Sequence, residues 1–140
     1  LDEDEDFCFT YGDGVADINI SELIKFHKKM GRKATLTSAF PPGRFGALEI
    51  VDDLIQTFQE KPDGDGSMVN AGFFVLSKKV LDKIIDDNTI WEQNPLKELA
   101  SDNELAAYRH DGFWQPMDKL SDKMYLENLW VKDKAPWKLW

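Results

Sequence analysis

The stretch Phe7-Cys8-Phe9-Thr10-Tyr11-Gly12-Asp13-Gly14 determines how this chain is expected to fold. Its first five residues are mostly aromatic, which is typical of a buried strand, and the two glycines around Asp13 predict a sharp turn where that strand ends. An acidic residue at the carboxyl end of a strand lies where open α/β sheets bind ligands, and glycine neighbours let a phosphate or metal ion approach closely. Asp-Gly is also common in ordinary turns, so the motif alone leaves both interpretations open.

Beyond this stretch, strand and helix patterns first alternate and then give way to consecutive strands. Ser21 is expected to cap a helix running to about Met30, with Gly31 ending it, and Ser77 is expected to cap a second helix. The other expected elements are strands over Ala34–Phe40, Phe45–Val51, Leu54–Glu60, Met68–Leu76 and Leu105–Tyr108, and helices over Trp91–Ala100 and Ser121–Trp130. In the Ser77 helix, Val80, Leu81, Ile84 and Ile85 form one apolar stripe. The pattern predicts an α/β fold with a sheet of mixed direction, in a single domain over residues 1–140.

Composition limits the classes of function. The 140 residues are 42% hydrophobic and 31% charged, with a net charge of −9 and an acidic start from Asp2 to Asp6. No basic stripe is visible in the sequence, so we expect no nucleic-acid partner, and no apolar run approaches the roughly 20 residues that span a membrane. Cys8 is the only cysteine and is expected to be a small buried residue in a reducing, cytoplasmic environment.

Three other motifs carry polar side chains suited to a phosphorylated sugar. Glu60 can accept hydrogen bonds from sugar hydroxyls, Lys61 can bind a phosphate as a point charge, and Asn70 offers a polyol both a donor and an acceptor. Their structural alternatives are a solvated loop and an asparagine at the start of a strand. Asp118 either caps the last helix or joins Asp13 as a second metal ligand, and spacing alone does not decide between these roles.

The two histidines offer no comparable signal. His27 and His110 have no partner at the spacing of a metal site or a catalytic triad. His27 shares the apolar face of its predicted helix, so we expect it to be a packed residue.

Taken in order, these motifs resemble those of the sugar-1-phosphate nucleotidyltransferase family, and within it the glucose-1-phosphate cytidylyltransferases. The matching blocks are Phe9–Asp17, Phe40–Leu48, Phe58–Pro62, Asn70–Val75, Trp91–Gln93, Phe113–Asp118 and Lys134–Lys138. The resemblance covers nearly the whole chain after the acidic start and implies the C-terminal part of a Rossmann-like fold. Family members begin with a Gly-Gly-x-Gly-Thr-Arg loop that holds the nucleotide phosphates, and the 140 residues contain no such sequence.

The resemblance implies roles for individual residues. Asp13 and Asp118 would be the Mg²⁺ ligands, Glu60 would hold sugar hydroxyls, and Lys61 would bind the sugar phosphate. Gly46 would let the backbone approach the hexose, with Asn70 nearby. Asp13, Lys61 and Asp118 would thus carry catalysis of an in-line attack by glucose 1-phosphate on CTP, which gives CDP-glucose and pyrophosphate. Without the nucleotide loop, we expect little or no turnover from these residues alone.

Two other classes of function stay open at this point. One is a non-catalytic domain that binds sugar phosphate or assembles with a partner chain. The other is a metal-dependent glycosyltransferase, which is disfavoured because Val15 stands where an Asp-x-Asp pair would have its second acid. The resemblance also implies a homo-oligomer. Trp130, Trp137 and Trp140 would then be buried against a neighbouring subunit, or would fold back onto their own domain.

Overall fold

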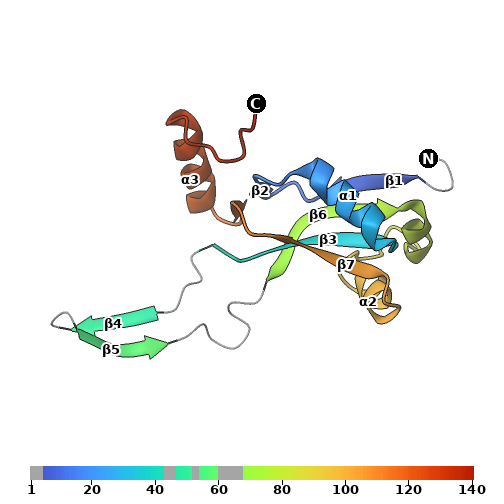
Figure 1. The fold of residues 1–140 in the computed structure, drawn as a ribbon, viewed down its shortest axis with the longest axis horizontal. Coiled ribbons are helices and arrows are strands. Elements are labelled where there is room, and N and C mark those ends of the chain that lie inside the picture. The colour runs from blue at the N-terminus through green and yellow to red at the C-terminus, as the bar shows by residue number, and fades with distance from the viewer. Residues whose placement is uncertain (1–4, 43–46, 52–53, 60–67) are drawn as a thin grey trace.

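A four-stranded sheet organises the computed structural model, which describes residues 5–42, 47–51, 54–59 and 68–140 (Figure 1). The strands lie in the order β1 (Asp6–Thr10), β6 (Val69–Ser77), β3 (Ala34–Ala39) and β7 (Leu105–His110). β6 is antiparallel to both of its neighbours, whereas β3 and β7 are parallel. The α/β class and the mixed sheet predicted from the sequence are therefore confirmed.

The strand directions give the sheet two chemically different ends. Since β1, β3 and β7 all run opposite to β6, their carboxyl ends lie together at the end of the sheet where β6 begins. That is the end at which open α/β sheets bind ligands. β1 pairs only with β6 among the described residues, so its other edge is open.

Helices cover both faces of the sheet. On one face, α1 (Ile20–Met30) buries Leu23 against Ile18 and Val75. On the other face, the short helix η1 (Lys78–Lys83) and helix α2 (Asn94–Ser101) pack around Phe74. Phe74 and Val75 are neighbours in β6 and point to opposite faces, so one strand supplies both cores. Full burial of a side chain of this size contributes about 1.5–3 kcal/mol.

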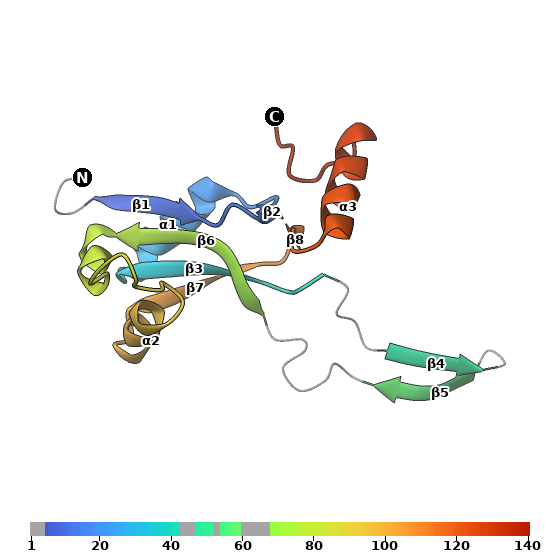
Figure 2. The same ribbon diagram turned by 180° about the vertical axis from the view of Figure 1, so that it is seen from behind.

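Two further strand pairs lie outside the main sheet. β2 (Gly14–Ala16) pairs antiparallel with β8 (Trp114–Pro116), and β4 (Ala47–Val51) pairs antiparallel with β5 (Leu54–Gln59). The second pair agrees with the sequence prediction, whereas β2 and β8 were not predicted because three residues give no periodic pattern. Helix α3 (Leu120–Val131) follows β8, and Figure 2 shows it at the end of the sheet away from the N-terminus. No helix of the described part is long and apolar enough to cross a membrane.

Of the two predicted serine caps, Ser21 is wrong and Ser77 is confirmed, although the helix after Ser77 is shorter than expected. α1 begins two residues earlier than expected, and its cap is Asn19 in place of Ser21, with the Asn19 Oδ1 accepting the Glu22 N–H at 3.1 Å. Ser77 caps a 3₁₀ helix that ends at Lys83 and not a longer α-helix. The N–H groups of Ile85 and Asp86 bond to Thr89 Oγ1, each at 3.1 Å, which diverts them from the ladder that would extend the helix.

The predicted apolar stripe of that helix is consequently broken. Val80 is buried, whereas Leu81, Ile84 and Ile85 are 40%, 46% and 87% exposed. The prediction that Cys8 is buried is also wrong, because Cys8 is exposed. Cys8 pairs with Val75 at the edge of the sheet, where α1 covers Val75 but does not reach Cys8.

Candidate active site

Asp13 and Asp118 lie on neighbouring backbone segments at the ligand-binding end of the sheet. Asp13 occupies the turn between β1 and β2, and Asp118 follows β8. The β2–β8 pairing places Gly14 opposite Pro116, and the Met117 N–H donates to the Asp13 carbonyl at 2.7 Å. The structure therefore brings together two residues that are more than 100 positions apart in the sequence.

The two aspartates have the chemistry that Mg²⁺ requires. Both are exposed, and both offer carboxylate oxygens, which this ion prefers. The ion usually takes only one or two carboxylates from a protein and fills its other positions with water and phosphate oxygens. In the residues that the structure describes, no group of three or more His, Cys, Asp or Glu side chains could hold a metal. A site here would therefore rest on this pair.

Asp118 does not cap α3. Instead, the Asp122 carboxylate accepts the backbone N–H groups of Asp118 and Lys119, both at 3.0 Å. The capping alternative for Asp118 is therefore wrong, while its role as a metal ligand stays a prediction.

Asn70 lies at the same end of the sheet and shapes the backbone of β6. Between Asn70 and Phe74, β6 contains two more residues than the facing segment of β3, from Ser38 to Leu36. The extra residues form a bulge in which the Gly72 N–H donates to Asn70 Oδ1 at 2.8 Å. Asn70 Nδ2 also donates to the Tyr11 hydroxyl at 3.2 Å. Asn70 is thus more than the start of a strand, since it joins β6 to the end of β1.

Tyr11 is a site residue that the sequence argument missed. The pKa of Tyr11 is raised to about 12. The larger cause is the partial burial of its phenol, and the second is a hydrogen bond between the phenol and Glu92. Tyr11 and Glu92 belong to the blocks Phe9–Asp17 and Trp91–Gln93, but the sequence around each residue does not indicate that they are in contact. Tyr11, Asn70 and Glu92 thus bring a hydroxyl, an amide and a carboxylate together at the end of β1, and such groups can form hydrogen bonds with a polyol.

Gly72 lets these groups come together. It has φ = +81°, which favours glycine, and a Cβ there would lie 2.6 Å from Tyr11 Cδ2. The Tyr11 N–H donates to the Gly72 carbonyl at 2.9 Å, and Trp114 Nε1 donates to the Ala71 carbonyl at 3.0 Å. The bulge of β6 is therefore fixed by β1 on one side and by β8 on the other.

Gly46, Glu60 and Lys61 lie outside the described residues. Their predicted contacts with the sugar and its phosphate stay predictions.

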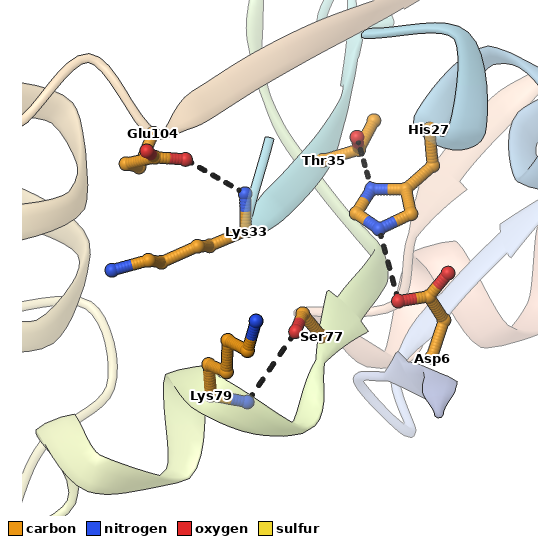
Figure 3. Close-up of polar contacts among 7 residues, drawn as sticks. All are labelled: Asp6, His27, Lys33, Thr35, Ser77, Lys79 and Glu104. Atoms are coloured by element: carbon orange, nitrogen blue, oxygen red, sulfur yellow. Dashed lines mark hydrogen bonds and ion pairs between the residues drawn. The ribbon is translucent and has the colours of Figure 1, made fainter. Parts of the chain in front are cut away.

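Each histidine has a partner that spacing did not reveal. His110 Nε2 lies 3.0 Å from both Asp17 Oδ1 and the Phe113 carbonyl, but only the carbonyl is placed to accept its hydrogen bond. His27 is 3% exposed, as its place on the apolar face predicted, and its Nδ1 lies 2.7 Å from Thr35 Oγ1. His27 lies at the other end of the sheet, beside the start of β1 (Figure 3).

The C-terminal tryptophans differ in how they pack, and their burial against a neighbouring subunit stays a prediction. Trp137 folds back onto its own chain, with its ring centroid 5.6 Å from that of Phe113. The ring centroids of Trp130 and Trp140 lie 6.5 Å apart, and the two residues are 49% and 81% exposed.

Comparison with known proteins shows the family of this chain. The family model described as "Nucleotidyl transferase" matches residues 1–118. The glucose-1-phosphate cytidylyltransferase of Salmonella typhi is 62% identical over 99% of this chain and 54% of its own length. The catalytic subunit beta of mannose-1-phosphate guanylyltransferase from Dictyostelium discoideum is 31% identical over 97% of this chain and 40% of its own length.

The solved structures show the same fold. A Bacillus anthracis crystal structure assigned as a glucose-1-phosphate thymidylyltransferase covers 92% of this chain and 55% of its own, with a TM-score of 0.65 and 17% identity. The chain thus spans about half the length of the curated relatives and of the solved structure that it matches.

Proposed function

Since this chain belongs to the nucleotidyl transferase family, we propose that it forms the sugar-phosphate- and metal-binding part of a glucose-1-phosphate cytidylyltransferase. The observation that carries the proposal is the hydrogen bond from Met117 to the Asp13 carbonyl, because it holds the Asp13 and Asp118 segments together at the ligand-binding end of the sheet. The 62% identity to an enzyme of that name supports the choice of glucose 1-phosphate and CTP as substrates.

In this proposal, the residues of the chain bind and orient the substrates. Asp13 and Asp118 would hold Mg²⁺, which supplies positive charge for the phosphate oxygens. Tyr11, Asn70 and Glu92 would orient the hexose by its hydroxyl groups, while Lys61 would bind its phosphate. An oxygen of that phosphate then attacks the α-phosphorus of CTP, the bond to the leaving pyrophosphate breaks, and CDP-glucose forms. Alignment and charge neutralisation suffice for this reaction, with no covalent enzyme intermediate.

We also propose that residues outside this chain hold the nucleotide phosphates. The 140 residues contain no Gly-Gly-x-Gly-Thr-Arg sequence, and β1 has an open edge in the described part. Beside that edge lies an apolar cavity of about 200 Å³, lined by residues that include Phe7, Phe9 and Trp91. Such a surface is suited to a further strand and its helices. The expectations that this chain is the C-terminal part and that it is cytoplasmic stay predictions.

Calorimetry with glucose 1-phosphate, with and without Mg²⁺, tests the binding role. We expect binding that depends on Mg²⁺ and that Asp13→Asn weakens by at least about tenfold, since it removes a charged ligand. Asp87→Asn is the control, because Asp87 is also exposed and lies in the turn after η1. Absence of heat under both conditions would contradict the proposal. So would an equal loss of affinity in the two variants.

A complementation assay tests the division between two parts. The chain alone is expected to release little pyrophosphate from CTP and glucose 1-phosphate. Adding the part of the Salmonella typhi relative that this chain does not match should restore release. Robust turnover by the 140 residues alone would show that the nucleotide phosphates are held within them.

The α3 surface supports a homo-oligomer. Along this helix Leu120, Met124 and Val131 are 72%, 60% and 82% exposed, and Trp130 adds an aromatic side chain. We expect a second copy to cover them, because exposed apolar side chains gathered on one element often mark a protein–protein contact. Light scattering should report a mass above 16.1 kDa. Val131→Asp should lower that mass, whereas a wild-type mass equal to that of one chain would refute the oligomer.

A further inference from the structure

A polar cleft lies at the end of the sheet opposite the candidate active site. Its volume is about 420 Å³, within the range of small-ligand pockets. It is formed where the starts of β1 and β7, the end of β6, the short helix η1 and the segment joining α1 to β3 meet (Figure 3). Its lining residues are Asp6, His27, Lys28, Gly31, Arg32, Lys33, Ser77, Lys79 and Glu104. The cleft lies at the start of β1 and Asp13 lies beyond its end, and four steps of about 3.3 Å make β1 about 13 Å long, so the cleft is a separate site.

The cleft gathers positive charge in a protein whose net charge is −9. Four cationic side chains line it, against two carboxylates. Three of the cations, Lys28, Arg32 and Lys33, come from one short segment, while Lys79 comes from η1. The sequence shows no basic stripe because the fold, and not the sequence, brings these two segments together.

The two carboxylates of the cleft have fixed partners. Glu104 Oε2 accepts the Lys33 backbone N–H at 3.0 Å, and Asp6 Oδ1 lies 3.5 Å from His27 Nε2. Behind them, His27 and Thr35 are buried and contact each other at 2.7 Å, which makes one wall of the cleft rigid. Within the described residues, no ion pair joins the side chains of Lys28, Arg32 or Lys33 to an acid.

The helix dipole explains only part of this arrangement. Basic residues in the last turn of a helix are favoured by its dipole, and Lys28 and Lys29 belong to the last turn of α1. Arg32 and Lys33 follow the helix, however, and Lys79 belongs to another element. Their convergence on one cleft therefore has no explanation in the stability of α1.

We propose that this cleft binds a small anion that carries two or more phosphate groups. Arg32 offers a planar fork suited to phosphate oxygens, and the lysines provide point charges that tolerate varied geometry. The cations come from two segments of the chain that meet at the cleft, so an anion with linked phosphates is better suited to contact both segments than a single phosphate is. Gly31 has open space around its Cα, so its side of the cleft presents bare backbone.

Titration of the ¹⁵N-labelled chain with pyrophosphate, at constant ionic strength and with EDTA to remove metals, tests the proposal. We expect saturable amide shifts at Gly31, Lys33 and Lys79, and none at Asn70 or Gly72. The exposed residues Lys28 and Arg32 can be changed without disturbing the core. Lys28→Ala and Arg32→Ala should each weaken binding by about tenfold, because each removes a charge-assisted contact.

Lys29→Ala is the matched control. It removes the same charge from the same turn of α1, but Lys29 does not line the cleft. Its effect should be less than about twofold, since exposed charges outside the site are screened by salt. If Lys28→Ala and Lys29→Ala lost equal affinity for pyrophosphate, the binding would be due to diffuse electrostatic attraction, and the proposal would be overturned. Shifts confined to Asn70 and Gly72, or no saturable shift, would do the same. Because the assay contains no metal or sugar, its failure is distinguishable from failure of the Mg²⁺-dependent binding of glucose 1-phosphate.

Discussion

Substitution of Gly72 by alanine measures how tightly the bulge of β6 is packed against Tyr11. The new Cβ would lie 2.6, 3.1 and 3.2 Å from Tyr11 Cδ2, Cγ and Cβ, and at least the shortest of these contacts forces an atom to move. Tyr11 cannot retreat freely, because its backbone N–H is bonded to Gly72 and its hydroxyl to Asn70. The left-handed φ of +81° adds a backbone penalty. A left-handed alanine costs about 1 kcal/mol and overpacking about 1–3 kcal/mol, so we expect a loss of about 2–4 kcal/mol.

Two other glycines separate these contributions. Gly31 also has a positive φ, +63°, but a Cβ added there would meet no atom within 4 Å, so Gly31→Ala should show only the backbone cost of about 1 kcal/mol. Gly12 has neither feature, so Gly12→Ala should change the free energy of unfolding by less than about 0.5 kcal/mol. Urea unfolding of the three variants gives the comparison.

A double-mutant cycle tests the cause directly. If the ring of Tyr11 creates the cost, Gly72→Ala in a Tyr11→Ala background should cost only about 1 kcal/mol, as at Gly31. The reasoning would be refuted if Gly72→Ala were no more destabilising than Gly31→Ala. It would also be refuted if the loss were unchanged without the Tyr11 ring.

Three other predictions concern the same contacts and one ion pair. Because its folded pKa is raised from 10.0 to about 12, Tyr11 should ionise late in an absorbance titration. Its contribution to stability is complete below pH 10.0, is lost as the pH rises toward about 12, and should disappear in Tyr11→Phe. Asn70→Ala should cost about 1–3 kcal/mol by urea unfolding, because the Gly72 N–H loses its acceptor, whereas Asn70→Asp keeps that acceptor and should cost less. Lys83 lies 2.9 Å from Glu98, so Lys83→Ala should lower Tm slightly at low salt and not at high salt.

The positions of the strands in the main sheet could be predicted from composition, since aromatic and β-branched residues are enriched in strands. The prediction that the strand before Gly12 is buried is wrong, because β1 is an edge strand whose residues are half-buried or exposed. The end of α1 was also predictable, because Gly31 adopts the left-handed conformation that glycine favours at a helix end. Its start was not, because Asn19 and Ser21 are both good caps and only the path of the chain selects between them. The length of η1 was unpredictable for a similar reason, since Thr89 takes the N–H groups that would have extended it.

The residues of the candidate site likewise differ in whether the local sequence could indicate them. Asp13, Asp118 and Asn70 could be found because each belongs to a local motif of turn or strand-end residues. Tyr11 and Glu92 gave no such signal, because the contact between them depends on how the segment before α2 packs against the end of β1. The meeting of Asp13 and Asp118 depends on β2 and β8, which are too short to leave a pattern.

The two proposed metal ligands and the residues of the β6 bulge differ in how much they contribute to stability. Asp13 and Asp118 are exposed, and their carboxylates make no hydrogen bond within the part that the structure describes, so replacing them removes a metal ligand at little cost to the fold. Asn70 and Gly72 are tied to each other and to Tyr11 by three hydrogen bonds and by close packing. Changes there must alter the fold and the position of Tyr11 together. A variant that loses sugar binding at full stability therefore identifies a ligand, whereas one that loses both identifies the β6 bulge that positions it.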